Sequence, residues 1–151
     1  MPGGTHKFVI RYDEVTKQYW TLSNKNTIPG APWQRNVLTL SCSKDLRNWQ
    51  VVKILMEDDQ EISAAQSLDK TSFSYADWFI EGDNIQYVIR CGYGDSKNFH
   101  DTNYIAYDVV ENFRQYSKDI SFDKESMPPV DVERTKQAVK KIQFVEDDRE
   151  E

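Results

Sequence analysis

The chain has 151 residues, of which 38% are hydrophobic and 13% aromatic, so it is long enough to form the core of one ordinary globular domain. Its 19 basic and 25 acidic residues give a net charge of -6, and acids crowd into the final "EDDREE", which leaves the rest nearly neutral. This balance argues against nucleic acid and anionic membrane as partners, and no apolar run approaches the ~18 residues of a membrane span.

Cysteine and histidine usage predicts no metal centre and no cofactor. Cys42 and Cys91 are far apart and lack ligand-like spacing, and His6 and His100 are the only histidines. We therefore expect two buried free thiols. No apolar segment after Met1 has the pattern of a signal peptide, so the residues themselves assign no compartment.

Residues 7 to 55 predict four antiparallel strands in a row. The alternating runs "KFVIRYD" and "QYWTLSN" flank the turn-like "EVTK" and indicate a hairpin. A loop containing Pro29, Gly30 and Pro32 leads into "NVLTLSCS", and "SKDLRN" then turns the chain into "WQVVKIL".

The same pattern recurs over residues 76 to 117. "YADWFI" turns through "EGDN" into "IQYVIRCGY", "TNYIAYDVV" follows a loop, and "ENFRQYS" closes the unit as its fourth strand. A tandem of four-stranded antiparallel units is typical of β-propeller blades. We therefore predict an all-β fold with about two blades, an incomplete β-propeller, within residues 1 to 120.

Two blades cannot close a ring, and each would leave an apolar face uncovered. We expect the chain to be part of a longer propeller or to associate with itself through exposed blade edges. An open sandwich of two blades is the alternative. Residues 121 to 151 break the strand pattern and predict a linker, a marginal helix beginning near Asp131, and an acidic disordered end.

The stretch "SKDLRNW", which contains Ser43, Asp45 and Trp49, resembles the Asp-box turn between the third and fourth strands of blades in sialidase-like and five-bladed glycosidase propellers. Four longer stretches extend the likeness over residues 3 to 114. They resemble the C-terminal blades of sialidase-superfamily proteins of the bacterial BNR-repeat type, in the same order and spacing: "GGTHKFVIRYDEVTKQYWTLSN", "RNVLTLSCSKDLRNW", "SYADWFIEGDNIQYVIRCGYG" and "HDTNYIAYDVVENFR".

The resemblance implies a carbohydrate partner and glycoside hydrolysis of the exo-sialidase type, including sialosides as substrates, in a protein family that is typically exported from bacteria. It also implies that the acid/base Asp and the first Arg of the substrate-carboxylate triad lie in earlier blades, and no stretch matches the family's Tyr nucleophile motif. We therefore expect the chain to be inactive alone. A non-catalytic carbohydrate-binding or interaction propeller, or a truncated remnant, is the alternative.

Blade geometry separates a structural rim from a binding rim. The Asp-box turn lies on the structural rim, where Ser43 and Asp45 can accept backbone N–H groups and Trp49 can pack between blades. The longer loops, at residues 24 to 36, 56 to 75 and 92 to 102, lie on the opposite rim, which is where propeller pockets form.

Seven residues on the binding rim are candidates for substrate binding or catalysis. Trp33 offers a stacking face and Arg35 a fork for a carboxylate, although both also suit an ordinary loop. Tyr75 and Asp77 begin the innermost strand of the second blade. Asp77 can act as a general base or hold a hydroxyl, or it can simply cap the strand.

The remaining candidates are Arg90, His100 and Asp101. Asp101 can fix the tautomer of His100, and Arg90 can lower the pKa of Asp101 and bind an anion, while a structural Asp-His turn is the alternative. Arg11 is expected to face the structural rim and to meet a carboxylate in its own blade. We thus assign Asp77, His100 and Asp101 to catalysis and the other four residues to substrate binding: Trp33, Arg35, Tyr75 and Arg90.

Overall fold

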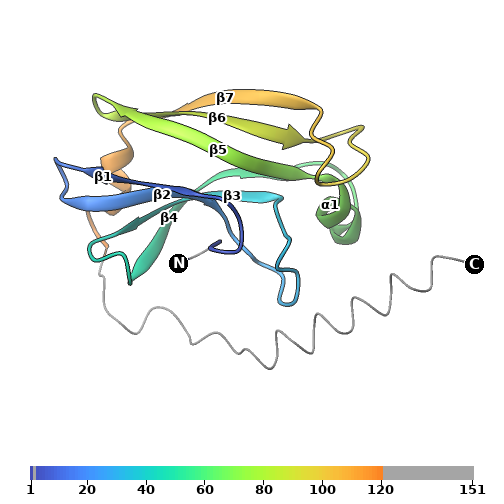
Figure 1. The fold of residues 1–151 in the computed structure, drawn as a ribbon, viewed down its shortest axis with the longest axis horizontal. Coiled ribbons are helices and arrows are strands. Elements are labelled where there is room, and N and C mark those ends of the chain that lie inside the picture. Colours follow the sequence, from blue (N-terminus) through green and yellow to red (C-terminus); the bar gives the residue numbers. More distant parts are fainter. Residues whose placement is uncertain (2, 121–151) are drawn as a thin grey trace, which may run out of the picture.

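The fold consists of two stacked antiparallel sheets with no closed barrel (Figure 1). It is seen in a computed structural model that describes residue 1 and residues 3 to 120; the helix and acidic end predicted for residues 121 to 151 lie outside the described residues. The first sheet has the order β1-β2-β3-β4 and contains β1 (Val9–Asp13), β2 (Gln18–Asn24), β3 (Val37–Ser43) and β4 (Trp49–Glu57). The second has the order β5-β6-β7 and contains β5 (Ser72–Glu81), β6 (Asn84–Gly92) and β7 (Tyr104–Val110).

The core lies between the two sheets and follows from the alternation of side chains along each strand. Trp20, Leu22 and Leu40 from the first sheet are at most 1% exposed and cluster with inward-facing residues of the second, such as Trp78 and Tyr87. The four-stranded unit predicted for residues 7 to 55 is confirmed in number and order of strands.

The two cysteines lie in this core as free thiols, as the sequence predicts. Burial raises the pKa of Cys42 to about 12 and also raises the pKa of Cys91. Because the thiolate is the reactive form, neither residue suits nucleophilic chemistry at neutral pH.

The prediction of a fourth strand in the second unit is wrong. After β7, Asn112 adopts a left-handed conformation with φ 48, and the chain continues as the 3-10 helix η1 (Phe113–Ser117). Phe113 is fully buried, and its ring meets Trp20 edge-on with centroids 4.8 Å apart. Burial of Phe113 against the first sheet draws the chain away from β7, which remains an edge strand.

The prediction that residues 56 to 75 form a loop is also wrong. In the structure β4 continues to Glu57, β5 begins at Ser72, and the intervening segment contains the helix α1 (Ala64–Lys70). Its start is a capping box, in which the Ser63 side chain accepts from the backbone of Gln66 and the Gln66 side chain accepts from the backbone of Ser63.

The two ends of the fold differ in the way that the strand order predicts. The tight turns β1–β2, β3–β4 and β5–β6 lie at one end together with η1, while α1 and the longer loops lie at the other (Figure 1). Among the residues that the structure describes, no helix is long and apolar enough to cross a membrane.

Candidate functional site

The turn at residues 43 to 49 is stabilised by hydrogen bonds among its own residues. Asp45 Oδ1 accepts from the backbone N–H groups of Arg47 at 2.9 Å and Asn48 at 2.8 Å, and these hydrogen bonds lower the pKa of the Asp45 carboxyl to about 2. The Asp45 N–H lies 3.3 Å from Ser43 Oγ. Trp49 is 2% exposed but is not part of the hydrophobic cluster between the two sheets, and its packing between blades stays a prediction.

At the opposite end of the fold, hydrogen bonds to its backbone carbonyl hold Arg35 against the second sheet. Its carbonyl accepts from the Phe73 N–H at 2.8 Å and from Asn24 Nδ2 at 3.2 Å. Asn24 Nδ2 also donates to the Phe73 carbonyl at 2.7 Å. The buried amide of Asn24 therefore ties the end of β2, the segment before β3 and the start of β5 together.

Tyr75 stands at an irregularity in β5. The pairing with β6 shifts between Ser74 and Asp77, and Tyr75 has φ 59 and remains 41% exposed. A bulky residue in the left-handed region costs about 1–2 kcal/mol of strain, and such strain concentrates at functional sites. The irregularity turns the ring of Tyr75 out of the regular strand.

Three cationic side chains surround this ring. Arg35 Cζ lies 5.8 Å, Arg90 Cζ 5.4 Å and Lys7 Nζ 5.5 Å from its centroid, all within cation–π range. Arg90 is held by Thr102 Oγ1, which accepts from its Nε at 3.1 Å and its Nη2 at 2.7 Å. The structure thus brings together three residues that the sequence assigned to substrate binding, namely Arg35, Tyr75 and Arg90.

Two hollows adjoin Tyr75, and we call them the large and the small hollow. The large hollow has a volume of about 600 Å³ and is lined by Lys7, Phe8, Val9, Tyr75, Ala76, Asp77 and Arg90. The small hollow has a volume of about 170 Å³ and is lined by Thr5, His6, Lys7, Asn24, Arg35, Ser74 and Tyr75. Lys7 and Tyr75 border both, so one ligand can contact both hollows.

Another hollow, of about 480 Å³, lies between the N-terminal residues and residues 26 to 32. The described residues that line it carry no charged side chain. We do not include it in the site, because no charged side chain among its described residues would orient a ligand.

Asp77 lies at the border of the large hollow, but its carboxylate already forms an ion pair and a hydrogen bond within the protein. Its Oδ1 lies 3.3 Å from Arg11 Nη2 and accepts from the Trp78 N–H at 2.9 Å. The expectation that Arg11 pairs within its own sheet is wrong, because this ion pair links β1 to β5. Arg11 Nε also donates to the Trp78 carbonyl at 2.5 Å, which explains why Arg11 points toward the second sheet.

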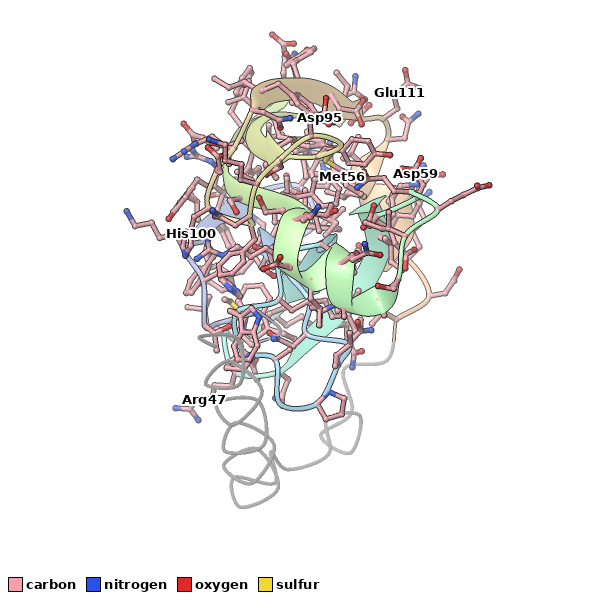
Figure 2. All side chains as sticks on the ribbon, turned by 90° about the vertical axis from the view of Figure 1, so that its right-hand side faces the viewer. Arg47, Met56, Asp59, Asp95, His100 and Glu111 are labelled. Atoms are coloured by element: carbon pink, nitrogen blue, oxygen red, sulfur yellow. The ribbon has the colours of Figure 1, made fainter. Side chains whose placement is uncertain are left out.

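The other three candidates, Trp33, His100 and Asp101, lie outside the two hollows. His100 and Asp101 are exposed, and Asn98 Oδ1 organises their loop by accepting from both backbone N–H groups, at 2.9 and 3.1 Å. Figure 2 shows His100 at the outer surface. Trp33 is half-buried, and its backbone forms a hydrogen bond with the side chain of His6. None of the three lines either hollow.

The residues of the site that sequence reasoning missed include His6, Lys7, Ser74 and Phe99. The Phe99 ring lies 5.5 Å from Arg35 Cζ, which places Arg35 between two aromatic rings. His6 and Lys7 reach the site because Gly3, with φ 70, packs directly on Asn24, where a Cβ would fall 1.8 Å from the Asn24 carbonyl oxygen. In the sequence, the local feature that could have indicated this placement is Gly3, which comes shortly before the adjacent basic residues His6 and Lys7.

Comparisons with protein families, curated proteins and solved structures found no match: no family model, no curated sequence and no solved structure is significantly similar to the chain.

Proposed function

We propose that the chain is a carbohydrate-binding portion of a sialidase-like propeller protein and that Tyr75 is the platform for the sugar. The observation that carries the proposal is the approach of Arg35, from the loop before β3, and Arg90, from β6, to one exposed tyrosine ring. Sugar rings pack on aromatic faces, and their hydroxyls accept hydrogen bonds from guanidinium groups. The large hollow beside Tyr75 falls in the size range of small-molecule sites.

Binding without catalysis fits the large hollow better than hydrolysis does. Glycoside hydrolysis requires two carboxyl groups that flank the scissile bond. Among the described residues that line the large hollow, Asp77 is the one carboxylate, and Arg11 already pairs with it. Hydrolysis, including that of sialosides, is the second candidate function; the position of Asp77 favours it, and it needs a further carboxylate besides those of the residues that line the large hollow.

The proposal is tested by titrating the chain with lactose and with N-acetylneuraminic acid in a calorimeter. We expect Tyr75→Ala to abolish sugar binding and Arg90→Gln to weaken it, because the first removes the platform and the second a donor. Arg47→Gln is the matched control, since Arg47 lies in the Asp-box turn and projects away from the fold (Figure 2). Binding that survives Tyr75→Ala unchanged, or no sugar binding by the folded chain, would refute the proposal.

The second candidate has its own test. Turnover of fluorogenic sialosides or other glycosides that disappears in Asp77→Asn would establish hydrolysis. The Arg11–Asp77 ion pair is largely exposed, so this substitution should leave the fold intact. Sugar binding without turnover would leave the chain as a binding protein.

A further inference from the structure

The small hollow is strongly cationic. Arg35 and Lys7 both line it, His6 contributes a third basic group, and none of the described residues around it is acidic. Arg35 is flanked there by the rings of Tyr75 and Phe99 instead of by a carboxylate. This composition favours an anionic ligand.

Two residues that line the small hollow each carry a buried polar atom that lacks a hydrogen-bond partner. In the described part of the chain, four buried side-chain atoms have no hydrogen-bond partner: Gln18 Oε1, Arg35 Nε, Ser41 Oγ and Ser74 Oγ. Two of them, on Arg35 and Ser74, belong to residues that line this hollow. Ser74 is only 3% exposed. Unpaired buried donors are costly to a fold, and an oxygen ligand would satisfy both.

His6 adds a titratable group to the same hollow. Burial and then the charge of Arg35 lower its pKa, and Thr5 Oγ1 lies 3.1 Å from its Nδ1. The charged and titratable groups around it are Lys7 on its own segment, Arg35 before β3 and Tyr75 on β5. An anion among these groups would favour the charged imidazolium, because it would offset the repulsion from Arg35.

We infer that the small hollow is an oxyanion pocket for a carboxylate or sulfate group of the sugar ligand, formed by Arg35, Lys7 and Ser74, with His6 as the member that takes up a proton. This inference rests on the proposed function, because it names the charged group of the sugar that packs on Tyr75. The volume of about 170 Å³ accommodates such a group together with a few water molecules at ~30 Å³ each.

The chain carries a built-in control for this inference, because His100 is the only other histidine. The two imidazoles are followed by NMR across pH at constant ionic strength, with sodium acetate or sodium sulfate replacing sodium chloride. We expect saturating oxyanion to raise the titration midpoint of His6 by about one pH unit, equivalent to tenfold tighter binding to the protonated form. The midpoint of His100 should not move.

Two variants and two matched controls complete the experiment. Arg35→Gln and Ser74→Ala should each lower the oxyanion affinity at least several-fold, whereas Arg47→Gln and Ser41→Ala should not change it. The backbone, not the side chain, fixes Arg35, so Arg35→Gln retains the ties to β5. Ser41→Ala removes a hydroxyl that is equally buried and unpaired but lies on β3.

Each outcome of these experiments either supports or overturns the inference. A response to acetate identifies a carboxylate pocket, and a response to sulfate alone identifies a sulfate-ester pocket; either supports the inference. Equal shifts of His6 and His100, no shift, or the same loss in the control variants overturns it. Lactose binding by a chain whose His6 does not respond to acetate or sulfate overturns this inference and leaves the proposed function standing. A His6 response to acetate or sulfate in a chain that binds no sugar refutes the proposed function and leaves the oxyanion pocket without its assignment to a sugar.

Discussion

Arg114 donates two hydrogen bonds to the carboxylate of Asp13, from Nε at 2.9 Å and from Nη2 at 2.8 Å. Its Nη1 also donates to Asp83 at 2.6 Å. The guanidinium thus joins η1 to the first turn of each sheet, at the end of the fold opposite to the candidate site. Asp13 is only 3% exposed, so this pair is well shielded from solvent.

Removal of Arg114 should therefore be strongly destabilising. We expect Arg114→Met to lower the free energy of unfolding by about 3–5 kcal/mol, because it leaves the buried Asp13 carboxylate without its main partner. Urea unfolding followed by tryptophan fluorescence measures this. Arg47→Met is the control and should change little. The double variant Asp13→Asn, Arg114→Met should lose less than the Arg114→Met variant, and a loss under about 1 kcal/mol in Arg114→Met would contradict the assignment.

The same ion pair predicts loss of stability in acid. Burial opposes ionisation of Asp13, but hydrogen bonds from Arg114 and Thr16 outweigh it and lower its pKa from 3.8 to about 2. Because the folded-state pKa lies below the unfolded one, the stabilisation is present above the unfolded pKa and disappears as pH falls from 3.8 through 2. The difference corresponds to about 2 kcal/mol.

The measurement is the free energy of unfolding as a function of pH in wild type and in Arg114→Gln. Asp45 titrates in the same range in both proteins, so the difference between the two curves reports the carboxylates that Arg114 contacts, of which Asp13 is the buried one and Asp83 is exposed. We expect the curves to converge as pH falls below about 4. Curves that stay parallel over this range would show that Arg114 does not set the pKa of Asp13.

The strand pattern was predictable because it is local. Alternation of buried and exposed residues, interrupted by short turns, located β1 to β4 and most of β5 to β7. The 3-10 helix was missed because it depends on a distant contact, the burial of Phe113 against Trp20. The helix α1 was missed although its capping residues, Ser63 and Gln66, are visible in the sequence.

The site was predictable only in part. Strand order was sufficient to place Arg35, Tyr75 and Arg90 at one end of the fold. Their approach to a single ring depends on the positive φ of Tyr75, which a residue type with strong strand preference does not reveal. His6 joins them through the packing of the segment before β1, which no repeat or periodicity encodes.

Lys17 offers a test of backbone strain away from the site. It closes the β1–β2 turn with φ 56, a conformation that glycine adopts without cost. We expect Lys17→Gly to raise the free energy of unfolding by about 1 kcal/mol, since the exposed pair with Glu14 contributes little. Thermal unfolding measures the gain. Lys17→Ala is the control and should show none, and equal effects of the two changes would exclude strain as the cause.

The outer face of the second sheet predicts self-association through that face, whereas the sequence analysis predicts self-association through blade edges. Phe79, Val88, Ile105 and Tyr107 expose 45–73% of their surface on neighbouring strands. Arg90 lies at one end of this face and Glu81 at the other. If two copies stack face to face with antiparallel strands, Arg90 of each copy meets Glu81 of the other, so we expect a symmetric dimer formed through this face instead of through blade edges.

Sedimentation velocity over a range of protein concentrations tests this dimer. Ile105→Lys should shift the equilibrium toward monomer, because it places a charge within the apolar face, on β7 directly opposite Arg90. Val15→Lys is the matched control: Val15 is 71% exposed, close to the 73% of Ile105, but lies in the β1–β2 turn. A charge reversal pair adds a second check, since Glu81→Lys should weaken the dimer and Glu81→Lys with Arg90→Glu should restore it. A chain that stays monomeric at millimolar concentration, or equal effects of Ile105→Lys and Val15→Lys, would contradict the prediction.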